Sequence, residues 1–209
     1  IIDGNKIAQR ITDNTKKEIE ELKGKGIFPK LIAVSVGESQ ASSVYIKQQK
    51  KNCEKIGIEY ELKKLPESYN ENQIISFIEE LNLDNKITGI ILQLPLPSGI
   101  DVKNVQSKIS PIKDVEGVNP VNLGWIIYGK PFLAPCTALA VKEIIDSLNI
   151  DLYGKEVVMV GHSDIVGKPV ALLLVNEFAT TCICHIGTSD KGKLETHVRR
   201  AEILIVAVG

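Results

Sequence analysis

The sequence predicts an α/β protein made of two three-layer α/β domains, with helices covering parallel sheets and a cleft between the domains. Strand-length runs that are almost continuously apolar, such as residues 31–36 and 203–208, are typical of strands buried on both faces of a parallel sheet. These runs alternate along the chain with segments in which apolar residues recur at three- and four-residue spacing, as they do on one face of a helix. Such alternation is the pattern of βαβ units.

Composition narrows the class of protein further. The 209 residues carry a formal charge of −1, with 44% hydrophobic and 24% charged residues, which is the composition of an ordinary globular protein. Near-neutral charge gives no basic footprint for nucleic acid, and no apolar run approaches the ~20 residues that cross a bilayer. The four cysteines, at positions 53, 136, 182 and 184, have no regular spacing. They favour a reducing cytoplasm over a disulfide framework.

Residues 1–119 are predicted to form the first domain. Ile7, Ile11 and Ile19 share one face of a helix that ends near Gly24 and Gly26, because glycine favours helix termination. Asn70 is expected to cap a later helix, and Pro95 ends the last strand because proline has no N–H for a central ladder. The predicted elements are a helix over 5–23, a strand over 31–36, a helix over 41–55, a strand over 58–62, a helix after residue 70 and a strand over 87–94.

Residues 120–149 are predicted to be a connecting loop and helix, and residues 150–209 part of a second domain. The stretch 111–135 is richer in Pro, Gly and Asn and is interpreted as a connection that carries functional loops, after which Thr137 caps a helix to about residue 148. Because nothing follows the apolar strand at 203–208, we expect a partner chain to shelter it or a further C-terminal segment to complete its sheet, and we favour the second. The other predicted elements are strands over 156–160 and 180–184 and helices over 167–177 and 194–200.

The turn at residues 160–169, VGHSDIVGKP, is the sharpest local motif. Gly161 at the strand end permits a tight turn, and Gly167 permits close approach of a ligand or of the sheet at the helix start. The N–H groups of such a helix terminus can face an anion such as a diphosphate. The spacing is Gly-x5-Gly rather than G-x-G-x-x-G, so a structural β-α turn and a nucleotide site both remain open on these residues alone.

Other polar residues lie where α/β proteins bind ligands. Tyr45 and Gln49 are four residues apart and share a face of the predicted helix, and Gln93 comes at the carboxyl end of a buried strand. The loop 113–117, KDVEG, holds two acids. Cys182 and Cys184 share one face of a strand, but no second pair of ligands at zinc spacing accompanies them, so we expect core packing and no metal site there. His197 is expected on a charged surface helix.

Together these motifs resemble the bifunctional methylenetetrahydrofolate dehydrogenase/methenyltetrahydrofolate cyclohydrolase family across the whole chain. The shared stretches are ASSVYIKQQKKNCEKIGI (41–58), GIILQLPLP (89–97), PIKDVEGVNPVNLG (111–124), APCT (134–137), VGHSDIVGKP (160–169) and AEILIVAVG (201–209).

The resemblance implies oxidation of 5,10-methylenetetrahydrofolate with NADP, or with NAD in some members, and hydrolysis of the methenyl product to 10-formyltetrahydrofolate. It further implies a cytoplasmic homodimer in the one-carbon metabolism that serves purine, methionine and histidine biosynthesis. The implied catalytic residues are Tyr45, Gln49, Gln93 and Glu116, and the implied folate-binding residues are Tyr45, Gln93, Leu94, Pro95 and Glu116. The second domain is then Rossmann-like but incomplete, with cofactor-binding residues Gly161, His162, Ser163, Ile165, Val166, Gly167, Pro169, His185 and Ile186.

Several positions depart from the family pattern. Gln49 replaces the family lysine, and an amide cannot exchange a proton as an amine can, so we expect a weak or absent cyclohydrolase step. Glu116 replaces an aspartate. His162 and Ile186 replace an arginine and a serine that can help to bind the 2′-phosphate of NADP, which leaves NAD as an alternative to NADP.

The family also continues beyond the position of Gly209. Two further alternatives stay open, a shikimate- or amino-acid-type dehydrogenase and a non-catalytic folate-binding protein.

Overall fold

The computed structural model describes the backbone of residues 1–37 and 40–208, and the side chains of residues 1–37 and 43–208. Ala41, Ser42 and Gly209 of the quoted motifs therefore lie outside the described side chains. The chain divides into two compact units, Asp3–Val115 and Glu116–Gly209, which are described separately below.

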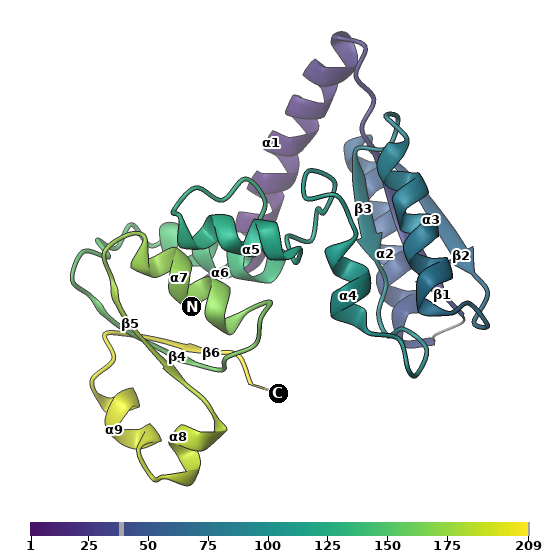
Figure 1. The fold of residues 1–209 in the computed structure, drawn as a ribbon. Helices are drawn as coiled ribbons and strands as arrows, with labels where there is room; N and C mark the ends of the chain where they lie inside the picture. Colours follow the sequence, from purple (N-terminus) through teal and green to yellow (C-terminus); the bar gives the residue numbers. More distant parts are fainter. Residues whose placement is uncertain (38–39, 209) are drawn as a thin grey trace. The chain divides into compact units, whose positions relative to one another are not determined.

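The first unit contains a parallel sheet of strands β1 (Lys30–Val36), β2 (Glu59–Leu65) and β3 (Gly89–Leu92), in the order β2-β1-β3 (Figure 1). In its register Leu31 lies beside Tyr60 on β2 and beside Gly89 on β3. Strand β1 is central, and its residues from Ile32 to Val36 are all buried. The nearly continuous apolar run in the sequence reflects this burial on both faces.

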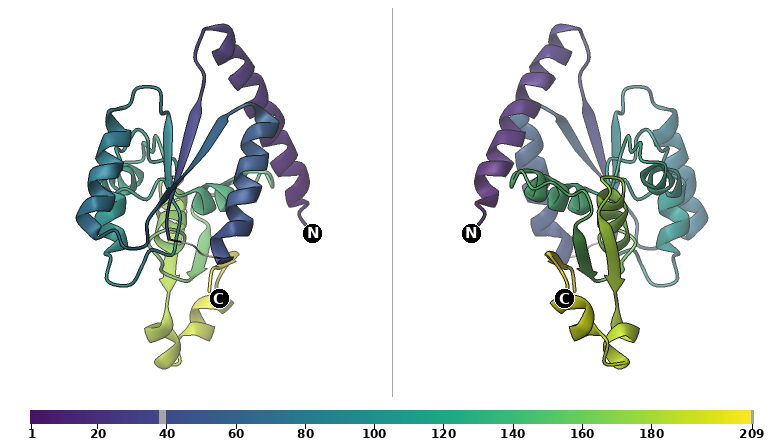
Figure 2. Two further views of the ribbon diagram at one scale, coloured as in Figure 1. Left: turned by 90° about the vertical axis from the view of Figure 1, so that its right-hand side faces the viewer. Right: turned by 90° about the vertical axis from the view of Figure 1, so that its left-hand side faces the viewer.

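The helices that accompany this sheet in the described residues are α1 (Gly4–Gly24), α2 (Gln40–Ile56), α3 (Glu71–Leu83) and α4 (Val102–Ser107). Helices α1 and α2 lie on one side of the sheet, and α3 and α4 on the other (Figure 2). Asp3 caps α1, and Asn70 caps α3 in a reciprocal capping box with Gln73. The buried apolar residues of α3, namely Ile74, Ile78 and Leu81, join the core of the sheet.

The second unit contains another parallel sheet, of strands β4 (Glu156–Val160), β5 (Thr180–Cys184) and β6 (Ile203–Val206), in the order β5-β4-β6. Val158 on β4 lies between Cys182 on β5 and Leu204 on β6. Strand β6 is half covered, because Leu204 and Val206 are exposed while Ile203 and Ile205 are partly buried.

Helices α5 (Pro120–Ile127), α6 (Cys136–Asp146) and α7 (Gly167–Val175) lie on one side of this sheet, and α8 (Ile186–Asp190) and α9 (Leu194–Arg199) lie on the other (Figure 1). Helix α7 is the most deeply buried of them, with six buried residues that include both Gly167 and Pro169. Among the described residues, no helix combines the length and apolar character needed to cross a membrane.

The α/β class with parallel sheets is confirmed, and strands β4 and β5 have the predicted limits. Three helices were not predicted: α4, α5 and α8. The stretch interpreted as a loop contains α5, which Asn119 caps and Pro120 opens, a signal for a helix start that is visible in the sequence. Thr137 is not a cap, because α6 already begins at Cys136 after Pro135.

Candidate functional site

Two glutamines of the first unit meet at the carboxyl edge of its sheet. Gln93 directly follows β3, where its N–H donates to the Val34 carbonyl at 2.8 Å and extends the ladder. Its side chain is 7% exposed, and its Nε2 donates to Oε1 of Gln49 on α2 at 2.8 Å. The contact joins two predicted site residues that are 44 positions apart in the sequence.

Tyr60 on β2 completes this cluster and was not predicted. Its hydroxyl donates to the same Gln49 Oε1 at 3.3 Å. Burial, and secondarily Cys53, raises the pKa of Tyr60 above its ordinary value of 10.0, so the phenol stays protonated and remains a donor. Only the register of β2 against β1 brings this tyrosine to α2, and a single sequence does not reveal that register.

Tyr45 lies one turn before Gln49 on α2 and is 72% exposed. Its ring is available to a flat ligand rather than packed in the core. Leu94 and Pro95 are exposed immediately after Gln93, and the peptide bond between them is cis. Tyr45, Gln49, Gln93, Leu94 and Pro95 therefore all lie in one unit, with an exposed aromatic ring and a partly buried amide pair.

The KDVEG segment contains two buried structural residues, Lys113 and Asp114, as well as the candidate folate-binding residue Glu116. Lys113 is buried, and its Nζ donates to the carbonyls of Leu81, Asn82 and Asp84 at 3.2, 2.7 and 2.7 Å. It therefore caps the carboxyl end of α3. Asp114 is fully buried beside Ile90.

Glu116 opens the second unit and is half-buried.

The glycine turn of the second unit has the close backbone contacts that its sequence predicts. Gly161 has φ +126°, and a Cβ there would lie 2.5 Å from the Ala207 carbonyl oxygen. A Cβ on Gly167 would lie 2.2 Å from the Gly161 carbonyl oxygen. No side chain fits at either position, so both glycines are required by the fold of the turn.

Ser163 holds the turn together. Its Oγ accepts from the N–H groups of Val166 and Gly167 at 3.2 and 3.4 Å. Lys168 pairs with Asp164 at 2.6 Å. A hollow of about 450 Å³ opens here, next to the amino terminus of α7, where the positive end of the helix dipole favours an anion. Its lining residues are Gly161, His162, Ser163, Asp164, Lys168, Ala207 and Val208.

The remaining predicted cofactor residues surround this turn. The rings of His162 and His185 lie 5.3 Å apart. His185 also caps α8, where its Nδ1 accepts from the Gly187 N–H at 3.2 Å. Ile165 and Ile186 are exposed, at 51% and 71%. Pro169 lies in the first turn of α7, as predicted.

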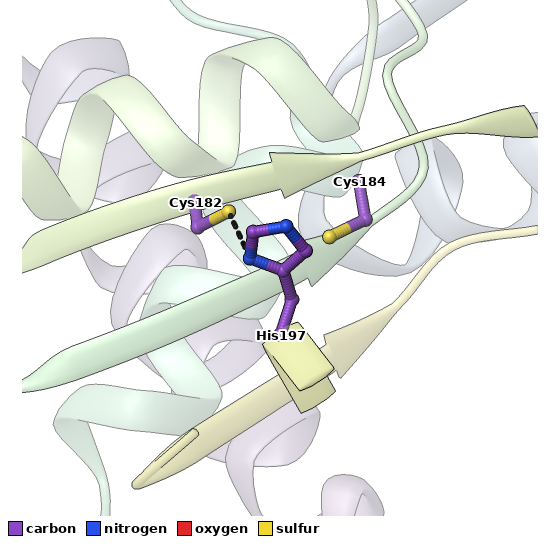
Figure 3. A group of neighbouring side chains, drawn as sticks. All are labelled: Cys182, Cys184 and His197. Atoms are coloured by element: carbon purple, nitrogen blue, oxygen red, sulfur yellow. Dashed lines mark hydrogen bonds between the residues drawn. The ribbon is translucent and has the colours of Figure 1, made fainter. Parts of the chain in front are cut away.

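The cysteine pair has a third neighbour that the sequence did not indicate. Cys182 and Cys184 lie on β5, and His197 on α9 reaches them (Figure 3). Cys182 Sγ lies 3.4 Å from His197 Nδ1. Burial, followed by the neighbouring Cys182, raises the pKa of the Cys184 thiol.

Comparisons with known proteins match both units. The family described as "Tetrahydrofolate dehydrogenase/cyclohydrolase, catalytic domain" matches residues 2–116, and its "NAD(P)-binding domain" matches residues 135–209. The bifunctional protein FolD of Nautilia profundicola is 46% identical over 209 residues, which cover 100% of this chain and 72% of that protein.

Solved structures of the same family have a similar fold. The crystal structure of the bifunctional enzyme FolD from Campylobacter jejuni, a methylenetetrahydrofolate dehydrogenase/cyclohydrolase, superposes with a TM-score of 0.94 at 38% identity, covering 99% of this chain and 73% of that one. The Trypanosoma brucei enzyme, solved with NADP cofactor and an inhibitor, superposes with a TM-score of 0.91 at 33% identity, covering 100% of this chain and 71% of that one. The chain therefore belongs to the tetrahydrofolate dehydrogenase/cyclohydrolase family, with a catalytic domain followed by an NAD(P)-binding domain.

Proposed function

We propose that this protein oxidises 5,10-methylenetetrahydrofolate to 5,10-methenyltetrahydrofolate with NADP. The observation that carries the proposal is the glycine turn of the NAD(P)-binding domain, where close backbone contacts allow no side chain at Gly161 or Gly167 and a hollow of about 450 Å³ lies beside the start of α7. NADP, when bound, supplies the nicotinamide ring that accepts the hydride. The chain itself binds and orients the two reactants.

The residues of each unit have distinct proposed tasks. The backbone of residues 161–167 and the start of α7 bind the diphosphate of the cofactor. The exposed Tyr45 ring stacks on the aromatic part of the folate, and Gln93 with Leu94 and Pro95 lines the same site. Glu116 offers a carboxylate to the pterin, whose N–H groups are donors. His162, His185, Ile165 and Ile186 border the cofactor.

The test is an assay of the purified full chain with methylenetetrahydrofolate and NADP, followed by the absorbance of NADPH and of the methenyl product. We expect equal amounts of the two products. Phe replacement of Tyr45 keeps a ring for stacking, whereas Tyr45→Ala removes it, so KM for the folate should rise in Tyr45→Ala and stay near its original value in Tyr45→Phe. Absence of folate-dependent NADPH formation would instead favour a non-catalytic folate-binding protein.

A second proposal concerns the hydrolysis step, and the Gln49 contact favours it. Gln49 accepts hydrogen bonds from both Gln93 and Tyr60, so its amide is held by neutral donors. None of these three groups exchanges a proton readily near neutral pH. We infer a dehydrogenase with a weak cyclohydrolase step. Rapid enzyme-dependent hydrolysis of methenyltetrahydrofolate would contradict this inference.

The preference for NADP over NAD is also a proposal. It rests on the structure of the Trypanosoma brucei relative with NADP and on His162, which lines the hollow and offers an imidazole N–H as a hydrogen-bond donor. We expect a higher kcat/KM with NADP than with NAD. His162→Ala should reduce the preference, measured as kcat/KM with NADP divided by kcat/KM with NAD, because it removes the ring that would lie near a 2′-phosphate. A higher kcat/KM with NAD than with NADP in the unaltered protein would overturn the preference.

We further propose a homodimer in the cytoplasm, acting in one-carbon metabolism that serves purine, methionine and histidine biosynthesis. The irregular spacing of the four cysteines, at positions 53, 136, 182 and 184, supports a reducing compartment. Sedimentation velocity on the full chain tests the oligomeric state, and a species of twice the chain mass is expected.

A further inference from the structure

A group of three metal-ligating side chains lies on the second unit, on the α8–α9 side of its sheet. Cys182 and Cys184 alternate with Ile183 along β5, so that the two thiols share one face while Ile183 packs toward the core on the other. His197 approaches from α9 (Figure 3). One ligand atom from each residue lies within 4.8 Å of the other two. Figure 3 shows the imidazole ring between the two sulfurs.

We propose that Cys182, Cys184 and His197 bind one Zn²⁺ ion through two thiolate sulfurs and one imidazole nitrogen, with a water molecule in the fourth position. Zinc takes Cys sulfur at about 2.3 Å and His nitrogen at about 2.0 Å in tetrahedral sites, which separates the ligand atoms by roughly 3.5–3.8 Å. The Cys182–His197 separation of 3.4 Å already lies near that range. The largest separation, within 4.8 Å, closes by about an ångström through side-chain rotation.

The chemistry of the group suits zinc better than it suits a disulfide. Residues two apart on an extended strand have Cα atoms about 6.6–6.8 Å apart, at the long limit for a disulfide. Zinc binding needs no oxidant: each thiol loses a proton to solvent as its S–Zn bond forms, and the two thiolates balance the charge of the ion. Cys184 is fully buried while Cys182 and His197 are partly exposed, which leaves a side open for the water ligand.

The surrounding structure indicates what the ion would stabilise. Helix α9 has six residues, buries none of them and lacks a side-chain cap, so little else holds it against β5. A metal shared by β5 and α9 would link them directly. Cys184 also immediately precedes His185, whose ring lies 5.3 Å from that of His162 at the cofactor hollow. The same ion would therefore fix the end of β5 that leads into this hollow.

The experiment uses the full chain without a polyhistidine tag. After dialysis against a chelator, Zn²⁺ is titrated in competition with a chromophoric chelator, and Co²⁺ replaces Zn²⁺ for absorption spectroscopy. We expect one metal ion per chain, thiolate-to-cobalt charge-transfer bands and the d–d bands of a tetrahedral site. Cys182→Ser and Cys184→Ser should each weaken zinc binding by at least about 100-fold, since they remove direct ligands. His197→Gln should weaken binding and shift the d–d bands while the sulfur bands remain.

Cys136→Ser is the matched control, because Cys136 is an exposed cysteine on α6 of the same unit, and it should leave zinc affinity unchanged. Circular dichroism verifies that each variant folds. The cobalt spectrum of the unaltered protein keeps the test decisive if a cysteine variant does not fold. The proposal fails if the unaltered protein shows no charge-transfer bands, if no stoichiometric zinc is retained, or if Cys136→Ser weakens binding as much as Cys182→Ser.

Discussion

A single side chain, Gln49, lies at the centre of the polar cluster of the first unit. Its Oε1 accepts from Gln93 and Tyr60. Gln49→Lys would place an amine there that can exchange a proton and donate to the oxygen of the Gln93 amide after that amide rotates. Acid–base groups typically contribute 10²–10⁴-fold to a rate, so we expect methenyltetrahydrofolate hydrolysis to rise by about 10²-fold or more, measured by the loss of methenyl absorbance.

Gln48→Lys is the control for this change. Gln48 is exposed on the same helix, where its Nε2 donates to Asn52 at 3.0 Å, and a lysine there adds the same charge away from Gln93. If Gln49→Lys hydrolyses the substrate no faster than Gln48→Lys, the assignment of the weak step to residue 49 is wrong.

Gly167 lies where the backbone leaves no room for a side chain. In Gly167→Ala the new methyl group meets the Gly161 carbonyl oxygen at 2.2 Å, and backbone must shift to relieve it. We expect unfolding free energy to fall by about 1–3 kcal/mol and NADP affinity to fall by about tenfold or more, measured by urea denaturation and by cofactor titration. At Gly124, on α5, a Cβ would meet no atom within 4 Å. Gly124→Ala should therefore raise the unfolding free energy by about 0.5–1 kcal/mol, because alanine favours the helix.

At the scale of the element, Lys113 links a loop to the carboxyl end of α3. Its Nζ donates to three carbonyls that the helix leaves without an internal partner. Lys113→Met keeps much of the apolar stem and removes the donors, so the unfolding free energy should fall by about 1–3 kcal/mol in a denaturant titration. Lys108→Met, at an exposed lysine of the same region, should change it by less than about 0.5 kcal/mol. Equal losses in the two variants would show that the three hydrogen bonds contribute nothing.

For the whole molecule, ion pairs at the amino edges of both sheets predict a pH dependence of stability. Lys63 and then Lys30 lower the pKa of Glu61 below its ordinary value of 4.5, and Lys155, with the Glu156 N–H, lowers that of Glu202. A lowered carboxyl pKa contributes stability above the unfolded value of about 4.5, and this contribution is lost as pH falls through the folded value.

On the alkaline side, the stability contributed by an ion pair is lost as the pH rises rather than as it falls. Glu59 and Glu61 raise the pKa of Lys30 to about 12, so its contribution is complete below its ordinary value of 10.5 and is lost as pH rises through about 12.

Thermal unfolding between about pH 3 and 7 measures the acid side. We expect Tm to decrease as the pH is lowered below about 4.5. The decrease should be smaller in Glu202→Gln, which lacks the titrating carboxyl, and at high salt, because salt screens exposed ion pairs. Glu20→Gln, an exposed residue of α1, should leave the profile unchanged. An identical acid profile in Glu202→Gln and the unaltered protein would contradict the role of the Glu202 pair.

The sequence by itself determined the elements whose signals are local. Strand-length apolar runs predicted both sheets, the Asn70 cap was confirmed, and the two glycines of the turn predicted the close backbone contacts at the end of β4. The signal for α5, Asn119 followed by Pro120, was present but was interpreted as a loop because periodicity around it is weak.

Only the tertiary structure decided which distant side chains meet. Gln49 contacts Gln93 across 44 positions, Lys113 reaches α3 across about 30, and His197 reaches Cys182 across 15. Each meeting depends on strand order, on register and on which face of a helix packs inward, and a shift of one residue in register would turn each strand side chain to the opposite face. Those quantities are fixed when two elements pack together, so they are not properties of either segment alone.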